Sequence, residues 1–126
     1  MSRAGYRLLA FVDDFGAALG AADLVVSRAG GSVWEVAAAG KPAILVPYPD
    51  ATANHQLKNA EYFERAGGAL IVLDRRARSD VPELTARLLA DPAVLRRMAD
   101  AMRTAAKPDA AERIADELVA LAAARR

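Results

Sequence analysis

The residues best suited to chemistry lie between Ala22 and Asn59, where a strand pattern, a glycine turn and a helix pattern follow one another. The strand pattern ends at Ser27, and an Arg-Ala-Gly-Gly turn precedes a helix that begins near Ser32. Glycines such as Gly30 and Gly31 let a ligand approach the backbone closely and supply unusual dihedral angles. The start of a helix offers unpaired N–H groups and a positive dipole end. The pattern therefore predicts a phosphate-binding turn at the carboxyl edge of a parallel sheet.

The same residues also fit a purely structural role. Ser32-Val33-Trp34-Glu35 matches the capping box S-x-x-E, in which the glutamate folds back onto the start of its own helix. A capping role and a ligand-binding role are compatible for Glu35. The sequence contains no G-K-S/T, so it has no P-loop, and no G-x-G-x-x-G supports a dinucleotide site.

The elements that must position this turn are indicated by four apolar runs that do not alternate with polar residues. Such runs are typical of strands covered on both faces, as in a parallel sheet. Helical patterns lie between them, and this alternation of strand and helix patterns predicts an α/β fold with a small Rossmann-like parallel sheet. The predicted strands are Tyr6 to Val12, Asp23 to Ser27, Ala43 to Pro47 and Ala69 to Leu73, and the predicted helices are Asp14 to Ala21, Ser32 to Ala39 and His55 to Ala66.

The last third of the chain is predicted to be helical. Ser79 or Asp80 is expected to cap a first helix, which Asp91-Pro92 ends. Lys107-Pro108 ends a second helix, and Asp109 with Glu112 resembles a capping box for a third. The apolar stripes of these helices are interpreted as packing surfaces; they comprise Val81, Leu84, Leu88 and Leu89, then Val94, Leu95, Met98, Ala101 and Met102, then Ile114, Leu118 and Leu121.

Composition and charge exclude several classes of function. Apolar residues make up 54% of the 126 residues, which argues against disorder and suits one domain. The 17 basic and 16 acidic residues nearly cancel, so no nucleic-acid footprint and no contact with a charged membrane are predicted. No run approaches the roughly 18 apolar residues of a membrane span, and no signal peptide is indicated. With no cysteine and one histidine, thiolate chemistry and a histidine-based metal cluster are excluded.

The stretch SRAGGSVWEVAAAGKPAILVPYP, followed by HQLKNA, resembles the donor-binding signature of the MurG family of bacterial peptidoglycan glycosyltransferases. FVDDF and the C-terminal AAERIADEL also resemble that family's C-terminal domain, so the resemblance covers residues 1–126. It implies one partial, Rossmann-like C-terminal domain of a GT-B glycosyltransferase that binds UDP-N-acetylglucosamine and adds N-acetylglucosamine to the lipid-linked muramyl-pentapeptide. It also implies no cofactor and no metal, and a cytoplasmic location at the inner face of the cell membrane in the intact enzyme.

The resemblance assigns roles to individual positions. Glu35 is expected to accept hydrogen bonds from the ribose hydroxyls of UDP, because a carboxylate offers two acceptor oxygens. The remaining residues divide by the part of the donor that they face. Gly30, Gly31 and Ser32 are assigned to the pyrophosphate, Phe11 and Val12 to the uracil, and His55 and Gln56 to the sugar, while Arg28 and Asn59 are assigned to ligand contact or to loop support.

The sequence departs from the family pattern in several places. The spacing from glycine to glutamate is one residue shorter than in the best-known members, and the loop from proline to glutamine is one longer. His55 replaces a glutamine, and Asp50 stands where histidine is frequent. Asp13-Asp14 is interpreted as a helix cap rather than as a metal site, since the family architecture needs no divalent ion.

The resemblance further implies that the chain lacks the two first strands of the C-terminal half, together with the N-terminal domain that holds the acceptor and the general base. In the strand order 3-2-1-4-5-6 the absent strands form the centre of the sheet, so the run Asp23 to Ser27 is expected to expose an open edge. The isolated chain is therefore expected to be marginally stable, to self-associate and to bind the donor weakly.

Three other functions compete with this one. The first is a different GT-B glycosyltransferase, and the second is a non-catalytic donor-binding subunit of a split enzyme. The third is a signalling receiver domain, suggested by FVDDF and by Lys41-Pro42. It is disfavoured because Arg28, and no acidic phosphoacceptor, follows the strand that ends at Ser27.

Overall fold

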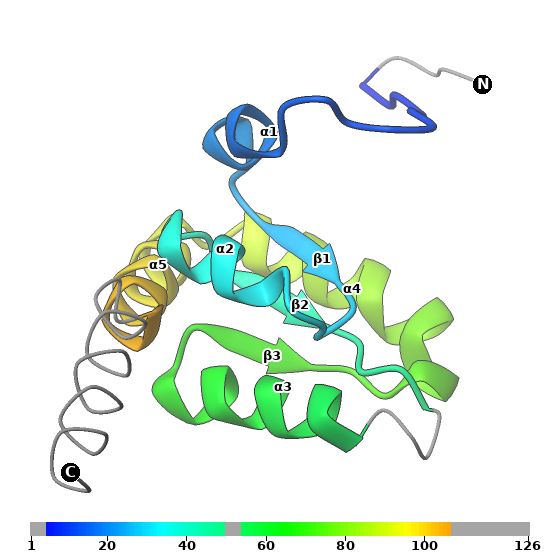
Figure 1. Cartoon of the computed structure of the whole chain (residues 1–126), viewed down its shortest axis with the longest axis vertical. Coiled ribbons are helices and arrows are strands. Elements are labelled where there is room, and N and C mark those ends of the chain that lie inside the picture. Colours follow the sequence, from blue (N-terminus) through cyan, green and yellow to red (C-terminus); the bar gives the residue numbers. More distant parts are fainter. Residues whose placement is uncertain (1–4, 50–53, 107–126) are drawn as a thin grey trace, which may run out of the picture.

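A computed structural model describes residues 5–49 and 54–106 and confirms an α/β fold around a small parallel sheet (Figure 1). The strands β1 (Val25–Ser27), β2 (Ala43–Leu45) and β3 (Ala69–Ile71) lie in the order β1-β2-β3, and both pairs are parallel. The register aligns the three strands over their whole length, with Val25 opposite Ala43 and Ala43 opposite Ala69. All three strands therefore end at the same edge of the sheet.

The helices agree with the sequence patterns to within one residue at most ends. The three predicted between the strands are present, and a 3-10 turn precedes the helical part of the last third. These elements are α1 (Phe15–Ala21), α2 (Val33–Ala38), α3 (Asn54–Ala66), η2 (Asp74–Arg76), α4 (Ala77–Leu89) and α5 (Pro92–Ala106). Asp14 caps α1 as expected, because its carboxylate accepts the Ala17 N–H at 2.9 Å.

The strand β2 lies at the centre of two apolar cores. Ala43 and Leu45 belong to a core formed with α2, α3 and α5, and Ile44 belongs to a second core formed with α4 and α5. Successive side chains of a strand point to opposite faces of the sheet, so a run that is apolar throughout serves both cores. All three residues of β2 are fully buried.

Aromatic side chains extend the first core between α2 and α3. The Phe63 ring is fully buried and meets Trp34 edge-on, with the ring centroids 4.9 Å apart. Tyr62 packs edge-on against Phe63 at 5.0 Å, and its hydroxyl donates to the Ala105 carbonyl at 2.7 Å. This cluster fixes α3 against both α2 and α5.

Glycines end two of these helices. Gly40 follows α2 with φ of 68°, and Gly67 follows α3 with φ of 94°. A residue with a side chain is strained in this left-handed conformation. At Gly40 a methyl group would also stand 2.5 Å from the Arg103 Nε. Both chain reversals therefore require glycine.

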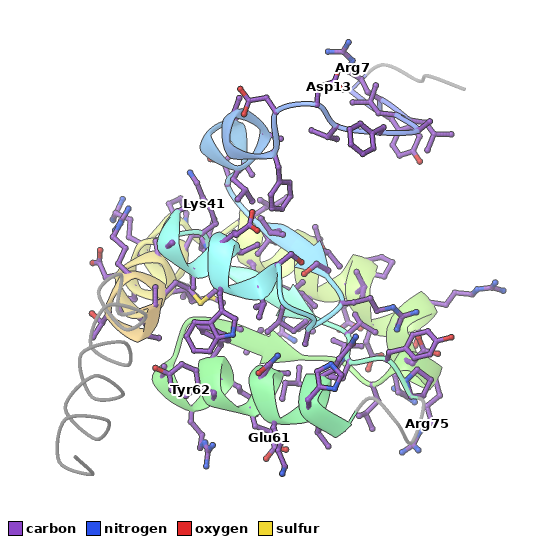
Figure 2. All side chains as sticks on the ribbon, in the orientation of Figure 1. Arg7, Asp13, Lys41, Glu61, Tyr62 and Arg75 are labelled. Atoms are coloured by element: carbon purple, nitrogen blue, oxygen red, sulfur yellow. The ribbon has the colours of Figure 1, made fainter. Side chains whose placement is uncertain are left out.

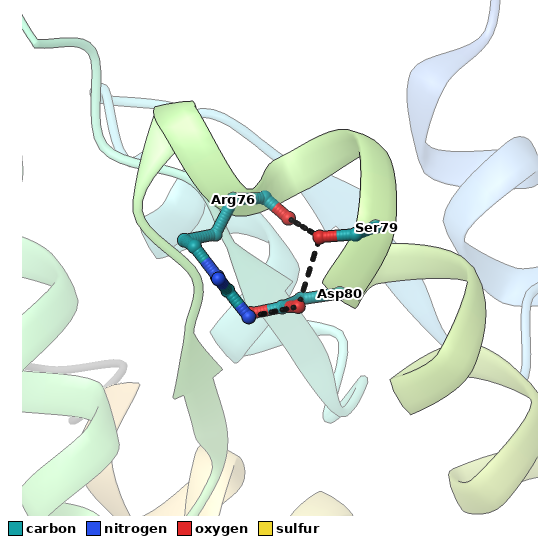
Figure 3. A network of polar contacts seen from close by, with 3 residues as sticks. All are labelled: Arg76, Ser79 and Asp80. Carbon is teal, nitrogen blue, oxygen red and sulfur yellow. Dashed lines mark hydrogen bonds and ion pairs between the residues drawn. The ribbon is translucent and has the colours of Figure 1, made fainter.

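The start of α4 differs from the prediction. Ser79 or Asp80 was expected to cap the helix, but η2 brings the chain into helical geometry earlier and α4 begins at Ala77. Asp80 instead lies in the first turn, where it accepts two hydrogen bonds from the Arg76 guanidinium, each at 3.2 Å (Figure 3). These bonds, with one from the Ser79 hydroxyl, hold the pKa of Asp80 below its ordinary value.

Two other predictions fail. The run Tyr6 to Val12 forms no strand, because no strand among the described residues pairs with it. Leu89 is half exposed and does not share the buried stripe of Leu88. Asp91-Pro92 separates α4 from α5 as predicted, whereas the capping box and the third helix, and Asp50, lie outside the described residues.

We predict that Phe63→Ala lowers the free energy of unfolding by about 3–5 kcal/mol, since it removes a fully buried ring. Urea unfolding of the two proteins measures the difference, and Phe63→Leu should lose less. Leu89→Ala, at a half-exposed position of α4, is the control and should change stability by no more than about 0.5 kcal/mol. Equal losses for Phe63→Ala and Leu89→Ala would show that the aromatic cluster does not stabilise the fold.

Candidate functional site

The candidate site is built around the turn that connects β1 to α2 at the carboxyl edge of the sheet. Three N–H groups at the start of α2 are already used there, because those of Val33, Trp34 and Glu35 donate to the carbonyls of Gly30, Gly31 and Ser32. Within the described residues, no backbone carbonyl accepts from the N–H groups of Gly30, Gly31 and Ser32 themselves. The donors available to a ligand thus belong to the turn and not to the helix.

The glycines of this turn differ from their predicted geometry. Neither Gly30 nor Gly31 has a positive φ, so the expectation of unusual dihedral angles there is wrong. A methyl group on Gly31 would meet no atom within 4 Å, and one on Gly30 would meet only the Gln56 amide nitrogen, at 3.7 Å. The fold itself does not require glycine at Gly31, which leaves close approach of a ligand as a reason for a residue without a side chain.

The first turns of α3 attach to this glycine turn. The Asn59 side-chain amide donates to the Ala29 carbonyl at 3.0 Å, and Ala29 is fully buried. The Gln56 carbonyl oxygen accepts the Tyr48 N–H at 2.9 Å. Two residues that the sequence placed in the site are therefore brought to the same turn, and they fix its position relative to the loop after β2.

Arg28 joins the ends of three elements. Its guanidinium donates to the Asp74 carboxylate at 2.6 Å and to the Val46 carbonyl at 3.4 Å, and it lies 5.2 Å from the centre of the Tyr48 ring. Arg28 was predicted to contact the ligand or to support the loop, and these contacts favour support. Asp74, 46 residues away in the chain, and Tyr48, on the loop after β2, were not predicted, because neither is a local neighbour of Arg28 in the sequence.

Ser32 and Glu35 do not form the capping box. The Ser32 side chain makes no capping hydrogen bond, and Ser32 itself has helical dihedral angles, with φ of −63° and ψ of −16°. A capping serine normally adopts extended geometry, so the helical backbone of Ser32 is not that of a capping residue. Both side chains are exposed, and within the described residues no side chain or backbone group donates to the Glu35 carboxylate. The carboxylate is thus available to a ligand.

The other predicted residues are His55, Phe11 and Val12. His55 is exposed in the first turn of α3, at the same edge as the glycine turn. Phe11 and Val12 belong to the segment that Figure 1 shows at a distance from the sheet, and the Phe11 side chain is 79% exposed. The structure therefore gathers the residues assigned to pyrophosphate, ribose and sugar but not those assigned to uracil.

Neither a metal cluster nor a membrane span is found in residues 5–49 and 54–106. No three His, Asp or Glu side chains there converge as metal ligands would. No helix of this part of the chain is long and apolar enough to cross a bilayer.

Residues 2–114 match the glycosyltransferase family 28 C-terminal domain. The chain is 48% identical over 126 residues to a UDP-N-acetylglucosamine--N-acetylmuramyl-(pentapeptide) pyrophosphoryl-undecaprenol N-acetylglucosamine transferase of Sorangium cellulosum, covering 95% of this chain and 30% of that protein. The protein of the same name from Salinibacter ruber is 43% identical over 117 residues, covering 92% and 32%. The crystal structure of Acinetobacter baumannii MurG superposes with a TM-score of 0.76 at 34% identity, covering 87% and 32%. The chain thus spans about a third of the length of these relatives.

We predict that Asn59→Ala loosens the glycine turn. The substitution leaves the buried Ala29 carbonyl without its donor, which should lower the free energy of unfolding by about 1–3 kcal/mol. Hydrogen exchange followed by NMR should be faster at the amides of Val33 and Trp34, which donate to the carbonyls of Gly30 and Gly31, than in the parent chain. Lys58→Ala, at the exposed neighbouring position, is the control and should leave both measurements unchanged. Unchanged exchange in Asn59→Ala would rule out this support of the turn.

Proposed function

Because this chain belongs to the family defined by the glycosyltransferase family 28 C-terminal domain, we propose that it is the UDP-N-acetylglucosamine-binding part of a hexosyltransferase. That enzyme adds N-acetylglucosamine to the lipid-linked muramyl-pentapeptide precursor of peptidoglycan. The observation that carries the proposal is the attachment of α3 to the glycine turn, through Asn59 and Gln56, beside the exposed Glu35 carboxylate. A turn, a carboxylate and an amide side chain are thereby presented together at the carboxyl edge of a parallel sheet, where ligands of such sheets bind.

The turn is suited to the pyrophosphate of the donor. Three consecutive N–H groups, those of Gly30, Gly31 and Ser32, have no backbone acceptor among the described residues, and the exposed Ser32 hydroxyl lies beside them. Hydrogen bonds from such groups to a charged oxygen are stronger than those between neutral groups. During transfer the departing UDP gains negative charge, so donors fixed at its phosphates would also stabilise the transition state.

Glu35 and the start of α3 are suited to the two sugars of the donor. Two ribose hydroxyls can donate to the two oxygens of the Glu35 carboxylate, for which no protein donor competes within the described residues. Gln56 keeps its amide nitrogen beside Gly30 while its carbonyl oxygen holds the Tyr48 N–H, which leaves the N–H₂ group to donate to the N-acetylglucosamine. His55 extends the same surface from the first turn of α3.

Among the described residues of the candidate site, we assign none to the base that the chemical step needs. An inverting transfer requires a base that removes the proton of the acceptor hydroxyl, and we assign both the base and the acceptor surface to the N-terminal domain of the intact enzyme. Because the acceptor carries an undecaprenyl lipid, we place the reaction at the inner face of the cell membrane. We assign no membrane contact and no metal to this chain.

We predict that Glu35→Ala weakens donor binding. UDP-N-acetylglucosamine titrated into the 126-residue chain should shift NMR signals of the glycine turn and of the first turn of α3, although the affinity is expected to be weak. Loss of up to two charge-assisted hydrogen bonds should weaken binding by at least ~10-fold. Glu61→Ala removes an exposed carboxylate from α3 and should bind like the parent chain. Equal shifts in Glu35→Ala and Glu61→Ala would remove Glu35 from the site.

We also predict preference for uridine over other nucleotides, with Phe11 and the main chain at Val12 lining the base in an intact enzyme. The measurement is competition in a hybrid in which this chain replaces the corresponding third of the Sorangium cellulosum relative. UDP should displace the donor at concentrations at which ADP and GDP do not, and Phe11→Ala should reduce the difference. Equal displacement by all three nucleotides would contradict the assignment of Phe11 and Val12.

A further inference from the structure

A second hollow lies at the amino edge of the sheet, opposite the candidate site. It has a volume of about 280 Å³, and the loops that lead into β1 and β2 form it together with one side of α5. Figure 2 shows Lys41, which precedes β2, and Arg75, which follows β3, on opposite sides of the molecule. The charged residues of this basic hollow are Lys41, Arg96, Arg103 and Asp23.

Cations outnumber anions in the basic hollow by three to one. The sequence as a whole has 17 basic and 16 acidic residues, so this excess is local. Among the described residues, neither Lys41 nor Arg96 forms an ion pair with a carboxylate. Charges of one sign around a concave wall reinforce one another, and the hollow therefore attracts anions.

Two contacts hold Arg103 in position. A methyl group on Gly40 would stand 2.5 Å from the Arg103 Nε and 2.9 Å from its Cζ, so the side chain lies directly on the backbone of this glycine. Asp100 accepts a hydrogen bond from the Arg103 Nη1 at 2.8 Å, whereas Nη2 has no acceptor among the described residues. A guanidinium fixed in this way is preorganised to donate to a phosphate, whose oxygens match its planar fork.

Lys41 brings a second cation to the same hollow, and this residue is partly buried. Its ammonium donates to the Gly20 carbonyl at 3.4 Å, which is longer than an ordinary N–H···O hydrogen bond. An ammonium carries three donors, so this one contact leaves others to bind an anion.

The apolar part of the wall narrows the class of ligand. Pro42, Leu95 and Ala99 line the hollow beside the cations, and its volume is near the lower limit for sites that hold small organic molecules. We propose that the basic hollow binds a phosphate ester, with Arg103 and Lys41 on the phosphate and the organic group against Leu95. The inference rests on the amino edge of the sheet, and it stands if donor binding at the carboxyl edge fails.

NMR titration of the 126-residue chain with glycerol 3-phosphate tests the proposal. Sodium chloride keeps the ionic strength constant, because salt screens surface charges. The amide signals of Gly40 and Lys41 should shift to saturation, and uncharged glycerol should not shift them. Arg103→Gln should raise the dissociation constant at least ~10-fold. Arg97→Gln, at an exposed position of α5 outside the hollow, is the matched control and should leave it unchanged.

Sedimentation with vesicles distinguishes a soluble ester from a lipid headgroup, since both present the same phosphate. Vesicles of phosphatidylglycerol and phosphatidylcholine are compared with vesicles of phosphatidylcholine alone. Binding of glycerol 3-phosphate without retention by either vesicle would identify a soluble ligand. Retention by the phosphatidylglycerol vesicles that Arg103→Gln abolishes and Arg97→Gln preserves would identify a headgroup.

Asp23→Asn gives a prediction of opposite sign. It removes the one carboxylate of the basic hollow and should lower the dissociation constant for glycerol 3-phosphate several-fold. Equal effects of Arg103→Gln and Arg97→Gln would reduce the binding to general surface charge and overturn the proposal. Shifts confined to the glycine turn from Gly30 to Ser32, or no response to either the ester or the vesicles, would overturn it as well.

Discussion

The structure depends on β2 being buried on both faces between two parallel neighbours. Ala43 and Leu45 serve the core of α2, α3 and α5, while Ile44 serves that of α4 and α5. Parallel pairing in a common register makes β1, β2 and β3 end together, so each loop that follows a strand opens at the same edge. Every residue of the candidate site that the structure gathers lies on such a loop or on the helix after it. The parallel sheet therefore determines where the candidate site lies, and the individual side chains determine only what it can bind.

Sequence patterns predicted most of this arrangement, because they report constraints that act locally. Uninterrupted apolar runs predicted the three strands, since a strand buried on both faces cannot alternate with polar residues. Asp14 was recognised as a helix cap because its partner, the Ala17 N–H, is three residues away. The strand predicted over Tyr6 to Val12 is absent because a strand also depends on a partner that local sequence does not reveal. Its residues have the right character, but a strand exists only where another strand pairs with it, and no property of the run itself supplies that partner.

The errors at the site have the same origin. The S-x-x-E pattern is compatible with a capping box, yet the helical dihedral angles of Ser32 prevent one. Gly30 and Gly31 were expected to supply unusual dihedral angles, whereas the turn is closed with negative φ by bonds from Val33 and Trp34. The contact between Arg28 and Asp74 joins residues 46 positions apart, which only the folded chain brings together. The assignment of these residues to a donor site stays a prediction, and the backbone determines which of their atoms have no protein partner among the described residues.

The backbone hydrogen bonds of the glycine turn also explain why the candidate site involves both α2 and α3. The first N–H groups of α2 are consumed by the turn that precedes it, so the helix end alone offers a phosphate few donors. The free donors sit on the turn at Gly30 to Ser32, a short segment without a stabilising side-chain cap of its own. Asn59, through the Ala29 carbonyl, ties this segment to α3, and the aromatic contacts of Phe63 tie α3 to α2. Order in the turn therefore depends on how α3 packs, and the amide of Gln56 reaches Gly30 from the same helix. On the proposed function, the turn would bind the donor pyrophosphate only while α2 and α3 are held together, so the core beneath them supports the candidate site.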